Sequence, residues 1–130
     1  MKMIHSMIRV RNLDVSVKFY QDAFNLVVKD RVSFPTFTLV YLSDNQGFEL
    51  ELTWNANNVD PYDLGAGYGH LAFLTDNLEN CWSRLEEARL RPQPIKSLSL
   101  TDKPFAKFFF LTDPDGYKIE ILERLGRFSQ

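Results

Sequence analysis

The chain has 130 residues, of which 45% are hydrophobic and 25% are charged, and its formal net charge is -2. This length allows one filled hydrophobic core but not two ordinary globular domains, and the composition excludes a disordered or fibrous protein. Its basic and acidic residues are interspersed and form no basic stripe that could bind nucleic acid. Its apolar runs are far shorter than the roughly 20 residues of a membrane-spanning helix. Its one cysteine excludes a disulfide framework. We expect a cytoplasmic protein with no nucleic-acid or membrane partner.

The first half of the chain predicts a strand, a helix and three further strands. Residues 3–10 alternate in polarity, which puts His5 and Arg9 on the same face of a strand. A helix is expected next, capped by Asn12 or Asp14 and ending near Asn25, because apolar residues then recur at helical spacing. Three strand-like runs follow, at residues 28–33, 37–42 and 48–53, the last two joined by the turn-rich segment SDNQG.

The second half repeats this order after an irregular stretch, residues 55–69. A strand is expected at residues 70–75 and a helix at about 78–90. The segment RPQPIKSLSLTDKP is interpreted as a loop with at most a short strand. FAKFFFLT and YKIEILE then form a hairpin around the turn DPDG.

The two halves match as an internal duplication. His5 precedes the pair Asn12-Leu13 by the same interval by which His70 precedes Asn77-Leu78, so these segments repeat at an offset of 65 residues. The run that ends in Glu51 resembles the run that ends in Glu120, at an offset of 69. These are the only two histidines in the chain. Each half therefore carries one His on its first strand and one Glu on its last, which predicts an α+β fold of paired βαβββ modules, at about residues 1–54 and 69–124.

The paired residues have the chemistry of a metal site. Taken singly, a strand His or Glu most often lies in the core or faces water, but the symmetry favours a shared role. Strand alternation puts Glu51 and Glu120 on the face opposite the helices. Carboxylates and imidazoles gathered inside a concave sheet are costly unless they are paired or bind a metal. Two nitrogens with two carboxylates suit Ni, Co, Zn, Fe or Mn better than Ca or Mg.

Several segments, in order along nearly the whole chain, resemble bacterial glyoxalase I, a lactoylglutathione lyase of the vicinal oxygen chelate superfamily. They are IHSMIRVRNLDVSVKFY, ELTWN, YDLGAGYGHLAF and DPDGYKIEILE. The resemblance implies a single glyoxalase-like domain whose metal ligands are His5, Glu51, His70 and Glu120. It also implies a homodimer with active sites shared between subunits, and one divalent ion per site, with nickel or cobalt favoured and zinc possible.

The same resemblance implies the substrate and the residues that hold it. The reaction would convert the hemithioacetal of methylglyoxal and glutathione into S-lactoylglutathione, with Glu120 as the leading base and Glu51 serving the opposite face of the substrate. Arg9, Asn55 and Lys96 would hold the glutathione moiety. The segment SLSLTDKPFAK departs from the glycine- and threonine-rich loop usual in the family, which leaves the thiol open.

Two other functions stay open at this point. His5, His70 and Glu120 alone would form the 2-His-1-carboxylate set of an iron dioxygenase, and thiol transferases occur among the relatives. Glu51 argues against both, because a fourth protein ligand leaves less room for dioxygen and a bidentate substrate. The second alternative is a non-catalytic module that binds a metal or a small molecule.

Overall fold

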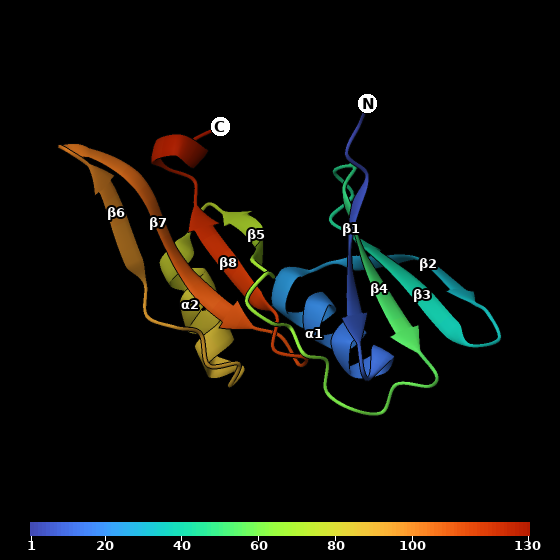
Figure 1. Cartoon of the computed structure of the whole chain (residues 1–130). Helices are drawn as coiled ribbons and strands as arrows, with labels where there is room; N and C mark the ends of the chain where they lie inside the picture. The colour runs from blue at the N-terminus through green and yellow to red at the C-terminus, as the bar shows by residue number, and fades with distance from the viewer. The chain divides into compact units, whose positions relative to one another are not determined.

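A computed structural model describes residues 1–130 and contains the strand and helix order βαβββ twice, followed by a short 3₁₀ helix (Figure 1). The chain divides into two compact units, Met1–Asp63 and Leu64–Gln130, and each unit holds one βαβββ set. The α+β fold class predicted from the sequence is confirmed. No helix of the chain is long and apolar enough to cross a membrane.

The first unit is a four-stranded sheet in the order β1-β4-β3-β2. Strand β1 is parallel to β4, and the other neighbours are antiparallel. The first and last strands of the unit are therefore neighbours, with β1 at the edge of the sheet and β4 inside it. The strands are β1 (His5–Val10), β2 (Val27–Ser33), β3 (Phe37–Ser43) and β4 (Glu49–Asn55).

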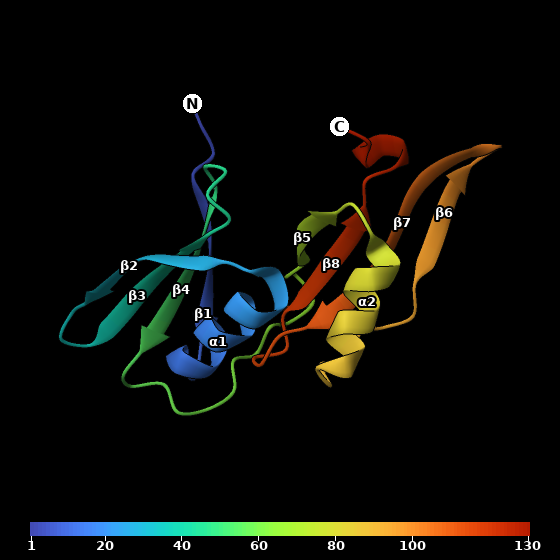
Figure 2. The same ribbon diagram turned by 180° about the vertical axis from the view of Figure 1, so that it is seen from behind.

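Helix α1 (Leu13–Phe24) covers one face of this sheet (Figure 2). Asn12 caps the helix, since its side chain accepts a hydrogen bond from the backbone N–H of Val15, and Asn25 ends it in the left-handed conformation. The helix buries Leu13, Ser16, Phe19, Tyr20 and Ala23. Against them lie the fully or nearly fully buried strand residues of the same face, namely Ile8, Val10, Val40, Leu42, Leu50 and Leu52.

The second unit repeats the arrangement with the strand order β5-β8-β7-β6. Strand β5 is parallel to β8, while β8, β7 and β6 are antiparallel neighbours. The turn between β7 and β8 is held by Asp113, whose side chain accepts backbone N–H bonds from Asp115 and Tyr117. The strands are β5 (His70–Thr75), β6 (Lys96–Leu100), β7 (Lys103–Thr112) and β8 (Lys118–Glu123).

Helix α2 (Leu78–Glu87) is shorter than the sequence predicted. Asn77 caps its start, and only Leu78 and Leu85 of the helix are buried. The prediction that the helix continues to Leu90 is wrong. Its end is set by Arg89, whose φ of 61° is left-handed, and the backbone N–H of Leu90 then bonds back to Leu85.

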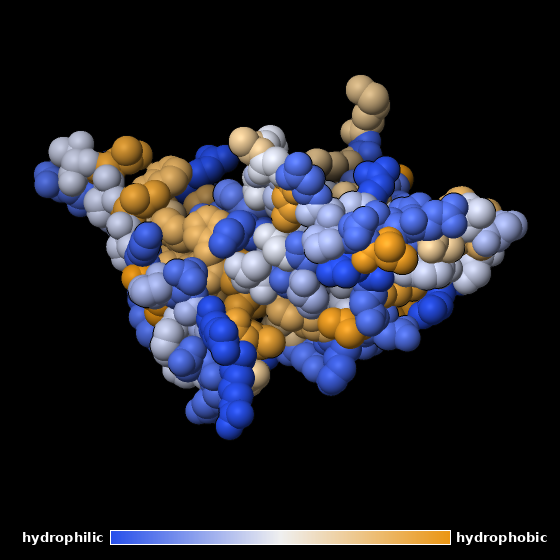
Figure 3. All heavy atoms as spheres, turned by 60° about the horizontal axis from the view of Figure 1, so that its bottom comes forward, coloured by the Kyte–Doolittle hydropathy of each residue, from blue (hydrophilic) through white to orange (hydrophobic).

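Residues 96–100 form the edge strand β6, which is the short strand that the sequence left open within this segment. Every residue of β6 is exposed, and flanking prolines hide its strand character in the sequence. Strand β6 is defined by its antiparallel pairing with β7, whose register shifts between Leu98 and Ser99. Leu98 and Leu100 leave apolar surface on this strand. Figure 3 shows apolar atoms gathered over the second unit, on the left side of that view.

The C-terminal 3₁₀ helix η1 (Gly126–Phe128) packs against β7 and has no counterpart in the first unit. Phe128 lies against a small apolar cluster of Ala106, Phe108 and Leu122. Gly126 adopts a φ of 55°, and a Cβ atom there would lie 2.4 Å from the carbonyl oxygen of Phe105. Only glycine fits this close approach of two backbone segments.

Candidate metal centre

In the first unit, His5 and Glu51 lie together on the sheet face opposite α1. Nε2 of His5 is 3.1 Å from Oε2 of Glu51. The two residues come from the parallel neighbours β1 and β4, where Met7 is the register partner of Glu51. The Glu51 side chain is only 12% exposed, whereas that of His5 is 37% exposed. The pair thus joins a buried carboxylate to an imidazole that is open on one side.

The second unit reproduces this pair with His70 and Glu120. Nε2 of His70 is also 3.1 Å from Oε2 of Glu120, and the two residues lie on the parallel neighbours β5 and β8. Here Ala72 is the register partner of Glu120, as Met7 is of Glu51. The side-chain exposures, 41% and 17%, follow the same order. The duplication inferred from the sequence thus extends to the atoms of the site.

The donor set of each pair fits a divalent transition ion. Two ligands at a right angle, each about 2.1 Å from an ion, lie about 3.0 Å apart, close to the spacing of both pairs. Imidazole nitrogen and carboxylate oxygen are donors that nickel, cobalt and zinc accept. No group of three or more His, Cys, Asp or Glu side chains suited to a metal occurs in the chain, so each pair offers two ligands. The set of four ligands stays a prediction.

Two hydroxyl side chains surround Glu51. Thr53, two residues along β4, donates a hydrogen bond from Oγ1 to Oε1 of Glu51 at 3.3 Å. Tyr41 on β3 is the direct register partner of Glu51, and its ring meets the His5 ring edge-on at 6.0 Å between centroids. Burial, then the charge of Glu51 and a hydrogen bond to it, raise the pKa of Tyr41, with smaller contributions from Glu49 and Asp30.

The corresponding positions around Glu120 are apolar. Phe110 on β7 is the register partner of Glu120, and its ring meets His70 edge-on at 5.3 Å between centroids. Leu122 takes the place that Thr53 has on β4 and is buried. On the same face Lys118 donates to Thr112 at 3.3 Å. The two pairs therefore share their geometry but not their surroundings.

Two of the three substrate-binding residues expected from the sequence belong to the first unit. Arg9 lies on the same face of β1 as His5, with Thr53 as its register partner, and its side chain is exposed. Asn55 ends β4 on the face of Glu51 and is half-buried. Both positions suit contacts with a molecule lying beside the His5–Glu51 pair. Their role in binding stays a prediction.

Lys96, the third of these residues, begins the edge strand β6 in the second unit. Its register partner is Phe108, which puts Lys96 on the same sheet face as Phe110 and Glu120. The lysine is exposed. It therefore stands on a strand rather than in the loop that the sequence predicted, and its role toward substrate also stays a prediction.

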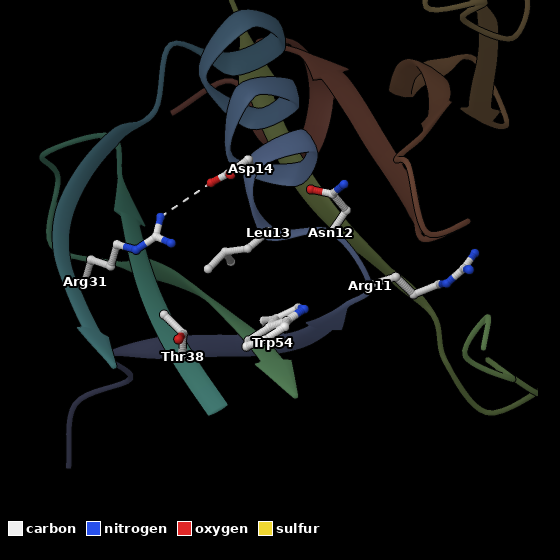
Figure 4. Close-up of a pocket in the computed structure, with 7 residues that line it drawn as sticks. All are labelled: Arg11, Asn12, Leu13, Asp14, Arg31, Thr38 and Trp54. Carbon is white, nitrogen blue, oxygen red and sulfur yellow. Dashed lines mark ion pairs between the residues drawn. The ribbon is translucent and has the colours of Figure 1, made fainter. Parts of the chain in front are cut away.

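A pocket of about 330 Å³ in the first unit lies on the other face of the sheet (Figure 4). It lies between the start of α1 and the sheet, where Trp54 on β4 faces Thr38 on β3, and Arg31 forms an ion pair with Asp14 at 3.5 Å across its mouth. Because alternate residues of β4 point to opposite faces, Trp54 points away from the side of Glu51 and Thr53. The pocket is therefore separate from the His5–Glu51 pair.

Tyr41 and Thr53 are the site residues that reasoning from the sequence missed. The signal for Thr53 was present, since it shares a strand face with Glu51. Finding Tyr41 required the register of the β3–β4 hairpin, which the connection at residues 44–48 sets.

Comparison with known proteins decides the family. Residues 2–121 match the family model of the Glyoxalase/Bleomycin resistance protein/Dioxygenase superfamily. The chain belongs to this superfamily. It is 35% identical to the lactoylglutathione lyase of Haemophilus influenzae over 135 residues, covering 95% of this chain and 93% of the relative. The lactoylglutathione lyase of a Neisseria meningitidis serogroup A strain is 32% identical, covering 95% and 91%. Within the superfamily the chain is a glyoxalase I-type lyase.

Solved structures agree with this assignment. The trypanothione-dependent glyoxalase I of Leishmania major is similar with a TM-score of 0.78 and 31% identity, covering 95% of this chain and 86% of that one. Glyoxalase I from Zea mays has a TM-score of 0.78 and 27% identity, covering 93% of this chain and 44% of that one. Membership of this family implies a divalent metal, which agrees with the donors found in each unit.

Proposed function

We propose that this glyoxalase I-type lyase isomerises the hemithioacetal of methylglyoxal and glutathione to S-lactoylglutathione, using one nickel or cobalt ion, with zinc as a possible substitute. The observation that carries the proposal is the repeated His–Glu pair, with the same 3.1 Å spacing in both units. The relatives named lactoylglutathione lyase support the reaction. The trypanothione dependence of the Leishmania major relative makes the thiol the part of the proposal most in need of a test.

In this proposal His5, Glu51, His70 and Glu120 hold the ion. When bound, a divalent ion supplies Lewis-acid stabilisation of negative charge on the substrate oxygens. Support comes from the donor chemistry and from the low exposure of both carboxylates, which is costly without a cation or a partner. One glyoxalase-like domain built from both modules would provide two ligands from each.

Glu120 is the proposed base. It takes the proton from the carbon that bears the hydroxyl group and sulfur and returns a proton to the adjacent carbonyl carbon, while the hydroxyl proton passes to the former carbonyl oxygen. The hemithioacetal thereby becomes a 2-hydroxyacyl thioester with no net gain or loss of atoms or electrons. A carboxylate suits this role because it can be within reach of both carbons, and general bases of this kind typically contribute about 10²- to 10⁴-fold in rate. Glu51 would serve the opposite face of the substrate.

Arg9, Asn55 and Lys96 are the proposed contacts for the thiol moiety. Each lies on a sheet face that also carries a metal ligand. An arginine can bind a carboxylate of glutathione through two parallel N–H bonds. Because such a contact is remote from the reacting carbons, Arg9→Ala should raise the KM for the glutathione adduct more than it lowers kcat.

We further propose a homodimer in which each site takes ligands from both subunits. Each unit contributes only two ligands, and a βαβββ sheet leaves one face open for a partner module to cover. Mixing a His5→Ala chain with a His70→Ala chain should restore part of the activity in verified heterodimers. No recovery there would mean that the ligands of a site come from one chain.

The testing experiment is a lyase assay on the chain reconstituted with nickel, cobalt or zinc. We expect turnover of the methylglyoxal–glutathione adduct with nickel or cobalt, and its loss after chelation. Parallel assays with trypanothione in place of glutathione identify the thiol. Tight metal binding without turnover of any thiol adduct would instead support a non-catalytic binding module, and a folded chain that binds no metal would exclude the proposed site.

A further inference from the structure

Glu51 and Glu120 have different surroundings, which suggests different roles for the two carboxylates. Tyr41 and Phe110 hold equivalent places, since each is the register partner of the site glutamate on the neighbouring strand and each meets the site histidine edge-on. Thr53 and Leu122 are likewise equivalent, two residues after the glutamate. At both places the first unit has a hydroxyl group and the second unit has none.

These hydroxyl groups act on Glu51 in a defined way. Oε2 of Glu51 lies 3.1 Å from His5, and Oε1 accepts the hydrogen bond of Thr53 at 3.3 Å. Tyr41 adds a second hydroxyl on the adjacent strand. With both oxygens engaged, rotation of this carboxylate would break at least one contact. Groups of this kind around a metal ligand fix its orientation, and their loss typically costs about 10- to 100-fold in affinity or activity.

Glu120 has a different environment. Its Oε2 contacts His70, while the ring of Phe110 and the buried side chain of Leu122 offer no donor. Lys118, on the same face, is engaged with Thr112. A carboxylate held on one oxygen can turn without breaking a hydrogen bond to a neighbouring hydroxyl. A base that takes a proton from one carbon and returns it to the adjacent carbon needs this freedom to turn.

We propose that Tyr41 and Thr53 are positioning residues that fix Glu51 as a stationary metal ligand, and that the apolar pair Phe110 and Leu122 leaves Glu120 free to move as the base. This inference rests on the proposed function, because it assumes that both glutamates meet a metal and a substrate. It goes beyond that function by proposing that four side chains outside the ligand set determine which glutamate is the fixed ligand and which is the base.

The test exchanges the two environments. Tyr41→Phe removes the hydroxyl beside Glu51, and Phe110→Tyr places one beside Glu120. For each variant the dissociation constant of nickel is measured by competition with a chromophoric chelator, and kcat and KM are measured at saturating nickel. For Tyr41→Phe we expect a metal affinity about 10-fold weaker and a smaller loss in kcat. For Phe110→Tyr we expect the reverse, a loss in kcat larger than any change in metal affinity.

Thr53 provides a second route to the same answer. Thr53→Val keeps the shape but removes the hydroxyl, so it should weaken nickel binding, and Thr53→Ser should restore much of it. Thermal melting of the metal-free variants separates these effects from a fold defect. A purely structural role for Tyr41 or Thr53 would change the melting temperature without this pattern in metal affinity.

Failure of this inference is distinguishable from failure of the proposed function. If the unmodified chain binds nickel and turns over substrate but Tyr41→Phe and Thr53→Val keep its metal affinity, the positioning roles are wrong. If Phe110→Tyr keeps full kcat, the claim that Glu120 needs freedom is wrong. If the unmodified chain binds no nickel, the proposed function itself is wrong.

Discussion

The two units repeat one architecture but are stabilised differently. Helix α1 buries five side chains against its sheet, including the aromatic residues Phe19 and Tyr20, whereas α2 buries only Leu78 and Leu85. The second unit has instead an ion-pair group in which Lys107 on β7 contacts Glu79 of α2 and Glu123 of β8. It also has the C-terminal η1 packed on β7. Equivalent folds thus do not require equivalent packing.

The site shows the same principle at the level of single residues. Both units keep the His–Glu spacing, which a shared metal would require, while the residues around the pair have diverged. Glu49 lies two residues before Glu51 on β4, and the equivalent position on β8 is Lys118. Tyr41 on β3 likewise occupies the position that Phe110 has on β7. Divergence around a constant pair suits a site in which two chemically identical ligands have different tasks.

The largest effect is expected from Glu120→Gln. Glutamine keeps the shape and one oxygen able to bind a metal but cannot accept the proton, so kcat should fall about 10²- to 10⁴-fold at saturating metal. Nickel occupancy, measured by metal analysis of the same sample, should fall only modestly. Glu49→Gln is the matched control, since Glu49 lies on the same face of β4 as Glu51 but is not one of the four proposed ligands. Near-normal turnover in Glu120→Gln at full occupancy would remove Glu120 as the base.

In the second unit, Leu85→Ala should lower stability through the loss of core packing. Leu85 is fully buried and is one of only two buried residues of α2, so its truncation should lower the free energy of unfolding by about 2–5 kcal/mol. Urea denaturation of both proteins provides the measurement. Leu100→Ala, at a 65% exposed position of β6, is the control and should change stability by less than about 0.5 kcal/mol. Equal effects at the two positions would contradict the described packing of α2.

A smaller loss is expected from Gly126→Ala at the start of η1. The added Cβ would lie 2.4 Å from the Phe105 carbonyl oxygen, and alanine would have to adopt a φ of 55°. Strain of this kind costs about 1–3 kcal/mol, so η1 should detach and its amide protons should exchange faster. Gly67→Ala meets no atom within 4 Å and should leave the exchange of η1 unchanged. Slow exchange of η1 in the Gly126→Ala variant would show that the segment tolerates the side chain.

The smallest effect concerns the ion pair that links α2 to β7. The hydrogen bond from Lys107 is the main cause that lowers the pKa of Glu79 below its ordinary value of 4.5. A carboxyl group with a lowered pKa stabilises the fold above its ordinary pKa, and this contribution is lost as the pH falls through the lowered value. The melting temperature of Glu79→Gln should therefore lie slightly below that of the unmodified chain at neutral pH. The two should converge well below pH 4.5, and a difference that persists there would contradict the ion-pair explanation.

Much of the fold could be predicted from the sequence because its signals are local. Asn12, one of the two cap candidates in the sequence, caps α1, and β5 has the predicted bounds His70–Thr75. The end of α2 could not be predicted, since a left-handed Arg89 in place of the usual glycine gives no composition signal. Strand β6 is likewise defined by its partner β7 rather than by its own residues.

The candidate site divides in the same way. The internal duplication and strand alternation pointed to His5, Glu51, His70 and Glu120 as one set, since the only two histidines of the chain stand at equivalent positions. The pairing within each unit comes from the structure. Tyr41 and Phe110 lie on the strands next to the glutamates, so they could be identified only once the hairpin registers were known. Residues that act through cross-strand contacts are the part of a site that strand periodicity does not reveal.

The most direct measurement of the central claim is the metal stoichiometry of the folded chain. After reconstitution with nickel and removal of free metal, elemental analysis should find one ion per chain, because in the proposed site two ligands from each unit hold one ion. His5→Ala and His70→Ala should each lose most of this ion, since either change leaves three ligands and removes one imidazole from the set. Two ions per chain, or one ion that is retained in full by either variant, would contradict a shared site and show that the His–Glu pairs act separately.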